Sequence, residues 1–347
     1  MLLTPSSVVQ HLVERDLLGA GRVVDTWLRV EPAIGRNRVF RVHGAGGGYF
    51  VKQPERWHPD ELASCEREAA ILGMRSGALG AIADLLPTLV DWQPTSRIMV
   101  LELLSGCTDL SAYYRVAVPS DVAETLGATT AMLHRGTVVR PGPDGAPGAM
   151  ADVPHADKPW AFSVSRQASL AGHSGDAYHA SIHQRLQREP STCASLEATA
   201  TRWRANALIH GDLKWSNWLA KVTSGQLEEL FVVDWEMGGV GDTAWDVASM
   251  LYSLVYAHAG GGTIGLSTAR PSLRAFVKGY FAETGFRAGY AMPFAERCVA
   301  YLGARCVQGV YELPATTTRA SLAEATLALA RSCLGESAQI ASMLVEA

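Results

Sequence analysis

The spacing of apolar residues changes from strand-like to helix-like along the chain. A threonine followed by proline at Thr4-Pro5 fits an N-cap and a first helical position, and apolar residues at helical spacing follow, so a short helix is expected. Residues 38–42 and 49–51 have strand-like patterning and are joined by a glycine cluster at 44–48. This arrangement predicts a hairpin in a small antiparallel sheet.

A helix is predicted at residues 60–75, and two further strands at 88–92 and 97–103. Beyond that point the pattern is predominantly helical. The helices predicted there span 107–116, 120–134, 177–188, 191–204, 244–258, 271–284, 291–311 and 320–345. The segment 136–160 is rich in proline and glycine, so it is expected to be an excursion rather than core.

These patterns predict an α+β fold with two lobes. A lobe with a small antiparallel sheet is expected at residues 1–103, and a larger helical lobe at 104–347. A chain of 347 residues is long enough for either one large two-lobed domain or two packed domains.

Composition and charge exclude several classes of partner. The net charge of −4 is modest and its residues are scattered, so no basic face for nucleic acid or anionic lipid is expected. No secretion signal or membrane-spanning apolar run is visible, and the six cysteines lack paired spacing. The expectation is a cytoplasmic protein with no nucleic-acid or membrane partner and with free thiols.

Lysine is rare in this sequence, and one lysine stands at a notable place. Of the 30 lysine and arginine residues only Lys52, Lys158, Lys214, Lys221 and Lys278 are lysine. Lys52 closes the extended segment 49–51, so a functional role is favoured over a solvent-facing lysine.

The segment 208–219 combines apolar flanks with a polar centre that carries Asp212 and, five residues later, Asn217. Such an aspartate can orient and deprotonate an acceptor hydroxyl, while the asparagine can hold a magnesium ion on phosphates. The alternative is a polar turn between two strands, which explains the residue types but not their arrangement.

A second carboxylate motif follows in the segment 230–236. An apolar strand ends at Asp234, and Glu236 comes two residues later. Asn217 with Asp234 makes a chemically sensible magnesium site, and Glu236 is a candidate ligand for a second ion. An aspartate at a strand end, taken alone, is more often a turn former.

These motifs together resemble the catalytic core of the aminoglycoside phosphotransferase and choline kinase family. The segments that carry the resemblance are His210-Gly211-Asp212 with Asn217, Val233 to Glu236, and Gly241 to Ala248. The resemblance implies a protein-kinase-like fold with a five-stranded N-terminal lobe, a helical C-terminal lobe and ATP as cofactor. It also implies a catalytic role for the His210 to Asp212 segment and a supporting role for Asp246 beneath that loop, where the alternative is an ordinary N-cap.

The same resemblance assigns the nucleotide-binding residues of the N-terminal lobe. Lys52 occupies the position of the lysine that binds the α- and β-phosphates, and Glu68 that of its helix partner, although Glu66 lies nearby. Residues 100–104, including Glu102 and Leu104, resemble the hinge whose backbone reads the adenine. The glycine cluster is not a phosphate-binding motif, so the phosphate-covering loop is expected at 34–38.

Lys214 bears on the acceptor of the phosphoryl group. Many members of that family carry His or another residue at this position, and the lysine here instead resembles the loop of Ser/Thr protein kinases, in which it steadies the transferred phosphoryl group. Such a role favours an alcohol acceptor, such as an aminoglycoside or amino alcohol; the alternative is a lysine facing solvent. Similar kinases act on Ser or Thr of precursor peptides, so a peptide acceptor with a partner lyase stays open. A nucleotide-binding partner without turnover is a weaker alternative. The acceptor is expected to lie against residues 136–190 and the C-terminal helices.

Overall fold

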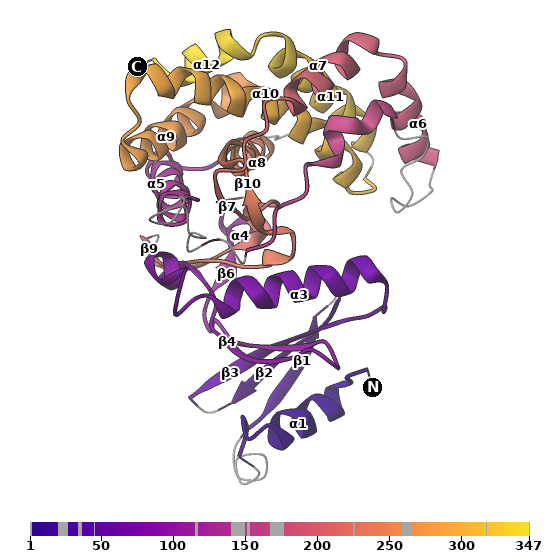
Figure 1. The fold of residues 1–347 in the computed structure, drawn as a ribbon, viewed down its shortest axis with the longest axis vertical. Coiled ribbons are helices and arrows are strands. Elements are labelled where there is room, and N and C mark those ends of the chain that lie inside the picture. Colours follow the sequence, from indigo (N-terminus) through magenta and orange to yellow (C-terminus); the bar gives the residue numbers. More distant parts are fainter. Residues whose placement is uncertain are drawn as a thin grey trace, which may run out of the picture. The chain divides into compact units, whose positions relative to one another are not determined.

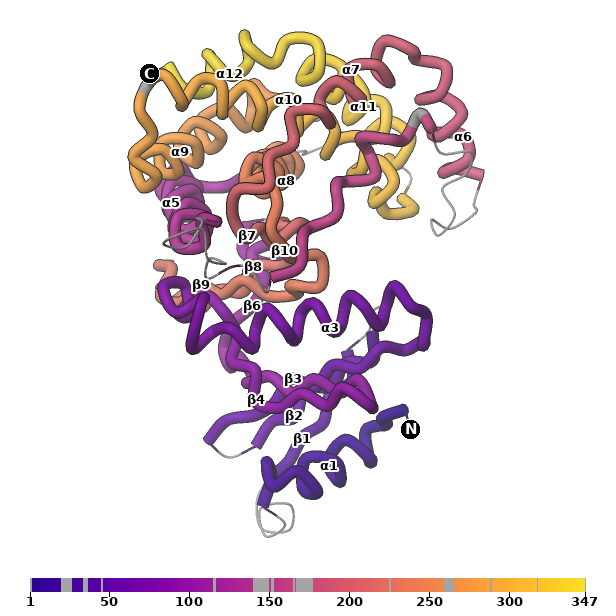
Figure 2. The backbone as a smooth tube through the Cα atoms, in the orientation of Figure 1, coloured from indigo at the N-terminus to yellow at the C-terminus, as the bar shows by residue number. Residues whose placement is uncertain are grey.

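In the computed structural model, two parts of the chain that are far apart in sequence fold together around a β-sheet (Figures 1 and 2). This sheet unit comprises Met1–Thr108 and Asn217–Gly238, and the helical unit comprises Asp109–Ser216 and Gly239–Ala347. The residues that the structure describes are 2–19, 27–33, 37–44, 46–114, 117–139, 150, 153–166, 177–224, 226–258, 265–316 and 318–346.

The division differs in two respects from the lobes expected at residues 1–103 and 104–347, and the smaller difference is that the first segment of the sheet unit ends at Thr108. The hairpin segment Asn217–Gly238 belongs to the sheet unit, although it follows more than a hundred residues of the helical unit in sequence. The reason is packing, because the short helix η5 (Trp235–Met237) contacts α3 (Pro59–Gly73). Periodicity within a segment carries no information about such a long-range contact.

The sheet unit contains five antiparallel strands in the order β1-β2-β3-β5-β4, as the fold prediction expected. Its other elements include three helices in the first segment, the β8–β9 hairpin and the short helix η5 that follows this hairpin. The bounds are α1 (Pro5–Glu14), β1 (Arg29–Ala33), β2 (Asn37–Gly44), β3 (Gly47–Pro54), η1 (Gly80–Leu85), β4 (Leu89–Gln93), β5 (Ile98–Glu102), β8 (Trp218–Thr223) and β9 (Gln226–Val232). The two-residue strand β6 (Thr108–Asp109) follows β5 in sequence.

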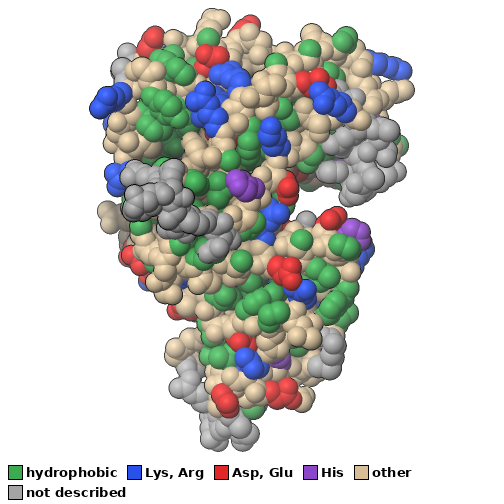
Figure 3. Space-filling view, viewed as in Figure 1, with side chains coloured by type: hydrophobic (Ala, Val, Ile, Leu, Met, Phe, Trp, Pro, Cys, Tyr) green, Lys and Arg blue, Asp and Glu red, His purple; other side chains and the backbone are tan. Residues whose placement is uncertain are grey.

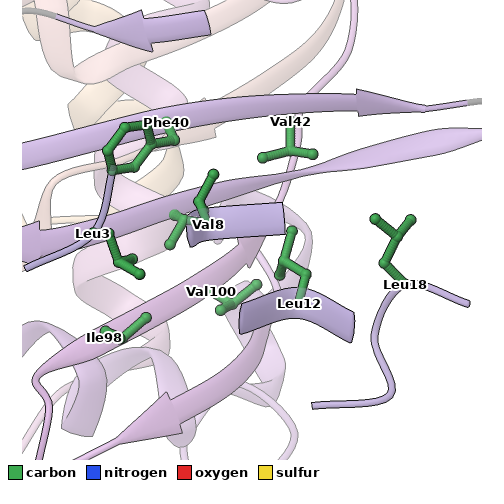
Figure 4. Packing of buried hydrophobic residues seen from close by; sticks show 9 residues of the cluster. Leu3, Val8, Leu12, Leu18, Phe40, Val42, Ile98 and Val100 are labelled. Atoms are coloured by element: carbon green, nitrogen blue, oxygen red, sulfur yellow. The ribbon is translucent and has the colours of Figure 1, made fainter. Parts of the chain in front are cut away.

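Helix α1 covers one face of the sheet and encloses its apolar core. Its start is a capping box in which Thr4 and Ser7 exchange side-chain to backbone hydrogen bonds. Figure 4 shows apolar side chains of this N-terminal segment facing those of the strands. The buried members of this cluster are Leu3, Val8, Leu12, Leu18, Phe40, Val42, Val51, Ile98 and Val100. Each such burial contributes about 1.5–3 kcal/mol, so the helix is anchored by its apolar stripe.

The opposite face of the sheet carries helix α3, as Figure 1 shows. Because successive strand residues point to opposite faces, Val51 faces the α1 side while Lys52 faces α3. The glycine cluster forms the β2–β3 turn, with Gly46 (φ 84°) and Gly47 (φ 143°) in backbone conformations that side-chain-bearing residues rarely adopt. Most of the phosphate-covering loop expected at 34–38, namely 34–36, lies outside the described residues.

The helical unit contains most of the helices that the periodicity predicted. Their bounds are α4 (Leu110–Tyr113), α5 (Ser120–Gly136), η3 (Trp160–Arg166), α6 (Ala177–Gln187), α7 (Pro190–Ala200), α8 (Thr243–Ala257), α9 (Leu266–Thr284), α10 (Ala288–Glu312), α11 (Arg319–Gly335) and α12 (Ser337–Val345). Two short strands, β7 (Ala207–Ile209) and β10 (Gly239–Gly241), pair antiparallel, and the turn η4 (Trp215–Asn217) follows β7.

Three predicted helices differ from the structure most clearly, and in addition α7 ends four residues before the end predicted at 204. The helix expected at 107–116 is a single turn, α4, and residues 115–116 lie outside the described part. The helix expected at 320–345 is two helices, because Glu336 leaves the helical conformation at φ −123° after Gly335. The helix expected at 271–284 begins earlier, so Pro271 lies inside α9 rather than at its start.

Helix α8 lies at the centre of the helical unit and packs against α9 and α10. All but one of its residues are buried, as a helix with neighbours on every side requires. Part of the expected excursion at 136–160 pairs with β10, where Ala156 N–H donates to Val240 O at 3.0 Å. Residues 140–149 and 151–152 of that segment lie outside the described part.

Charged side chains of both signs are scattered over the face shown in Figure 3, without a continuous basic surface there. Among the helices of the described residues, none combines the length and apolar character needed to cross a bilayer.

Candidate functional site

A buried lysine contacts three carboxylates in the sheet unit. Lys52 Nζ lies 2.7 Å from Glu68 Oε2 on α3 and 2.6 Å from Asp234 Oδ1, which follows β9. Glu236 Oε2 lies 3.5 Å from the same nitrogen. Lys52 is only 5% exposed, so its charge interacts with these groups rather than with bulk water.

The carboxylates around Lys52, here called the lysine cluster, are residues that could hold a divalent cation. Burial acts to lower the pKa of Lys52, but the carboxylates of Glu68, Asp234 and Glu236 outweigh it and hold that pKa above its ordinary value. Burial raises the pKa of Glu68, while Asp234 and Glu236 are the more exposed carboxylates of the three. Carboxylate oxygens of the same three residues lie within 4.8 Å of one another. Hard oxygen ligands with a net negative charge are the donor set that Mg²⁺ requires.

Helix α3 contains three glutamates, and among them Glu68 is the one that contacts the lysine. Glu68 is 1% exposed and holds Lys52, and it also accepts a hydrogen bond from the Trp235 backbone N–H at 3.3 Å. Glu66 is exposed and pairs with Arg97 instead. Residues two apart on a helix point in different directions, which separates the two roles.

The β8–β9 hairpin places the expected magnesium ligands at one end of the same element. Val233 N–H donates to Asn217 O at 2.9 Å, next to the Trp218–Val232 register pair. Asp234 follows in a left-handed conformation with φ 68° and ψ 57°. Non-glycine residues in this conformation are uncommon, although aspartate tolerates it better than most, and strained residues concentrate at functional sites. Asn217 is buried.

The loop of the helical unit that carries Asp212 is held by helix α8. The Asp246 carboxylate accepts the backbone N–H groups of His210 at 2.7 Å and Gly211 at 2.9 Å. Trp245 Nε1 donates to Gly211 O at 2.8 Å. Gly211 has φ 81°, which a Cβ would disfavour, so glycine suits this turn. These hydrogen bonds from α8 therefore hold the loop in a fixed conformation.

Lys214 contacts the aspartate of its own loop. Its Nζ donates to Asp212 Oδ2 at 2.6 Å. Burial acts to lower the pKa of Lys214, but the Asp212 carboxylate outweighs it, so the pKa lies above its ordinary value. The Lys214 side chain is 36% exposed, so it contacts solvent as well as Asp212.

The segment expected to act as hinge forms part of the sheet unit. Glu102 N–H donates to Thr88 O, and Leu103 N–H donates to Gly48 O, both at 3.0 Å. Glu102 and Leu104 line a groove of about 870 Å³ in that unit. The backbone N–H groups of Glu102 and Leu103 therefore hold this segment in the sheet unit.

Sequence reasoning missed two buried supports of the helical unit. His134 on α5 lies with Nε2 3.2 Å from Asp246 Oδ2 and Nδ1 2.9 Å from Tyr280 Oη. Asp242 caps α8 by accepting from Ala244 N–H at 3.1 Å. The aspartate lies within the Gly241 to Ala248 motif and could have been found there. A single histidine at a helix end gives no comparable signal.

The comparisons with known proteins agree with this architecture. The model of the APH phosphotransferase enzyme family matches residues 33–290. A choline/ethanolamine kinase family protein from Mesorhizobium loti has 19% identity and a TM-score of 0.51, with 98% of this chain and 99% of that chain covered. Plasmodium vivax ethanolamine kinase has 12% identity and a TM-score of 0.58, with 96% and 87% covered. The microcompartment-associated aminopropanol kinase has 16% identity and a TM-score of 0.57, with 96% and 98% covered.

At these identities the solved structures show a shared fold, the kinase-like α+β fold expected from the sequence. No curated protein is significantly similar in sequence. The family model, however, covers well over half of the chain and includes all the motifs described above. The protein is therefore an enzyme that belongs to the APH phosphotransferase family.

Proposed function

We propose that the protein transfers the γ-phosphoryl group of ATP to a hydroxyl of a small molecule in the presence of Mg²⁺. The observation that carries the proposal is the lysine cluster, where buried Lys52 meets Glu68, Asp234 and Glu236. The Lys52 ammonium can bind phosphate oxygens, and the carboxylates beside it can bind the metal ion that accompanies a nucleotide.

In the sheet unit, Lys52 would contact the α- and β-phosphates, with Glu68 holding its side chain in place. Asn217, Asp234 and Glu236 would hold magnesium, because they offer hard oxygen ligands at one end of the β8–β9 hairpin. Magnesium, when bound, neutralises charge on the phosphate oxygens. Glu102 and Leu104 would read the adenine through their backbone.

In the helical unit, Asp212 would orient the acceptor hydroxyl and take its proton. Lys214, which already contacts that carboxylate, would steady the transferred phosphoryl group. His210 has a positioning role, because its ring Nδ1 accepts the Asp212 backbone N–H at 3.3 Å while the residue itself is fully buried. Asp246 keeps this loop rigid.

The family membership favours a small-molecule acceptor, since the similar structures are named as kinases of choline or ethanolamine and of aminopropanol. An aminoglycoside or amino alcohol is the first class to test. A Ser/Thr-rich precursor peptide, which would imply a partner lyase, belongs in the same screen.

The test is a phosphotransfer screen that follows the mass shift of each acceptor with ATP and Mg²⁺. We expect one acceptor class to gain a phosphate in a reaction that requires both Asp212 and the metal. Transfer to the peptide alone would replace the small-molecule acceptor with a peptide. ATP binding without transfer to any acceptor, or to water, would favour the non-catalytic alternative.

A further inference from the structure

Three buried side chains from three neighbouring helices of the helical unit form a series of hydrogen bonds next to the loop that carries Asp212. Tyr280 Oη on α9 lies 2.9 Å from His134 Nδ1 on α5, and His134 Nε2 lies 3.2 Å from Asp246 Oδ2 on α8. Each of the three residues is at most 3% exposed. Because they are shielded from bulk water, the direction of each hydrogen bond depends on the three groups themselves.

The Asp246 carboxylate determines the direction at one end of this series. It accepts the backbone N–H groups of His210 and Gly211, and the His134 ring supplies the third nitrogen beside it. A carboxylate stabilises a ring nitrogen that carries hydrogen and repels a nitrogen lone pair. We therefore assign His134 the tautomer with hydrogen on Nε2.

The Tyr280 phenol determines the direction at the other end. A neutral imidazole with hydrogen on Nε2 has a lone pair on Nδ1, so a donor is required there. Burial raises the pKa of Tyr280 well above its ordinary value, so the phenol keeps its hydrogen. The Thr243 side chain forms a hydrogen bond with the same phenol and acts to lower that pKa, as a donor does. Tyr280 therefore donates to His134 and accepts from Thr243.

Helix packing fixes the Tyr280 ring within reach of His134. The preceding residue is Gly279, where a Cβ would lie 2.1 Å from Glu124 O on α5, so the close approach of α9 to α5 requires glycine. The Tyr280 ring stacks on Phe294 with centroids 5.5 Å apart and meets the His134 ring edge-on at 5.8 Å. Phenylalanine in place of Tyr280 would keep these ring contacts and remove only the hydroxyl.

We propose that Tyr280 is a positioning residue for the loop that carries Asp212. By donating to Nδ1 it holds His134 in one tautomer and one ring orientation, in which the Nε2–H group points at Asp246. The carboxylate that holds the loop backbone is thereby oriented from α9. The consequence for catalysis rests on the proposed function, because it concerns the aspartate that takes the acceptor proton.

Tyr280→Phe isolates the contribution of the hydroxyl. Loss of the phenol hydrogen leaves the buried Nδ1 lone pair without its donor, which destabilises this state of the ring relative to other tautomers, protonation states and orientations. A mixture then replaces the single state of His134. The N–H groups of His210 and Gly211 are consequently held by a carboxylate whose orientation varies.

Nitrogen NMR of the full chain with ¹⁵N-labelled histidine reads the tautomer directly. We expect His134 to carry hydrogen on Nε2 alone in the unmodified chain, and to become mixed or doubly protonated in Tyr280→Phe. Hydrogen exchange of the His210 and Gly211 amides, followed by mass spectrometry, should become about tenfold faster in this variant. Hydrogen on Nδ1 in the unmodified chain, or unchanged exchange in the variant, would overturn the inference.

Tyr301→Phe is the matched control. Tyr301 Oη donates to Asp242 Oδ2 at 2.9 Å, so this variant also removes a buried hydroxyl from a buried carboxylate of the helical unit. Both variants should lose stability to a similar degree in denaturant titration, but only Tyr280→Phe should change the His134 spectrum and the exchange of the loop. Equal effects of the two variants on the loop would contradict a specific role of Tyr280.

Substitutions of His134 test its two nitrogens separately. The amide nitrogen of glutamine can take the place of Nε2, whereas that of asparagine reaches only the place of Nδ1. His134→Gln should therefore keep most of the loop protection, and His134→Asn should lose it. The opposite ranking would sink the assigned tautomer. If Tyr280→Phe fails to fold, these two variants and the spectrum of the unmodified chain decide the outcome.

Phosphotransfer kinetics with the acceptor identified by the screen separate this inference from the proposed function. Tyr280→Phe should lower kcat about tenfold and leave the KM for ATP within about twofold, because the loop rather than the lysine cluster is affected. Normal kcat despite faster loop exchange would reject the positioning role. Absence of transfer in the unmodified chain would reject the proposed function, and the spectral and exchange measurements would still decide whether Tyr280 supports the loop.

Discussion

At the scale of single residues, the chemistry of the sheet unit depends on one buried cation. A lysine removed from water keeps its charge only if carboxylates compensate for the lost solvation, and Lys52 has three of them. Glu68 is the buried partner, and Asp234 and Glu236 are more exposed. The exposed carboxylates are therefore the ones that a ligand or metal can reach.

Two of the glutamates of α3, Glu68 and Glu66, offer a matched pair of substitutions. We expect Glu68→Gln to reduce the free energy of unfolding by about 1–3 kcal/mol, because Lys52 loses a charged, buried hydrogen-bond partner. Glu66→Gln removes only an exposed pair with Arg97 and should change it by less than about 1 kcal/mol. Denaturant titration measures both, and equal effects would contradict the assignment of Glu68.

Asp212 is the residue whose loss should affect chemistry more than binding. Asp212→Ala is expected to slow phosphotransfer by roughly a hundred- to ten-thousandfold while nucleotide affinity persists, because the group that takes the hydroxyl proton is removed. Asp121→Ala, an exposed aspartate on α5, is the control. Steady-state kinetics with the acceptor identified by the screen measure the effect. Near-normal turnover would remove Asp212 from the role of base.

At the scale of elements, close helix packing positions residues that support the loop that carries Asp212. Helices α5 and α9 approach each other through glycines, and α5 also carries His134, which contacts Asp246. A Cβ at Gly127 would lie 2.0 Å from Phe276 O, and one at Gly279 would lie 2.1 Å from Glu124 O. The clashing atoms belong to the backbone, so side-chain rearrangement cannot relieve them.

Gly127→Ala should therefore reduce the free energy of unfolding by about 1–3 kcal/mol through overpacking. The matched control is Gly289→Ala on α10, where nothing lies within 4 Å of an added Cβ. There we expect a gain of about 0.5–1 kcal/mol from the better helix propensity of alanine. Thermal and denaturant unfolding test the pair, and opposite signs are the expected result.

At the scale of the whole molecule, ligand binding should be measurable as stability. ATP with Mg²⁺ at about a hundredfold above its dissociation constant should add roughly 2.7 kcal/mol and raise the melting temperature. Chelation of the metal should remove much of that shift, because the carboxylates of Asp234 and Glu236 then lose the cation that they are proposed to hold. Asp234→Asn should weaken the dependence on metal. A shift that is independent of divalent cation would contradict the proposed magnesium ligands.

Much of the architecture could be predicted because apolar stripes determine which faces a helix or strand buries. The bounds of α5, α6 and α8 lie within two residues of the predicted ones. The predicted helix bounds were wrong at two places that involve proline or glycine. Pro271 lies inside α9, although proline usually marks a helix start or end, and Gly335 followed by the non-helical Glu336 divides α11 from α12.

The amino-acid sequence alone determined the family, the α+β fold and the loops that carry the reactive groups, since motifs of a few residues express local spacing. Tertiary packing alone decided which glutamate holds Lys52. The contacts around this lysine join residues that are far apart in the chain; Lys52 and Asp234, for example, are 182 positions apart. Packing also decided that Tyr280 contacts His134, which lies 146 positions earlier in the sequence. No periodicity records such pairs, because they exist only once helices and strands have been brought together by the burial of their apolar faces.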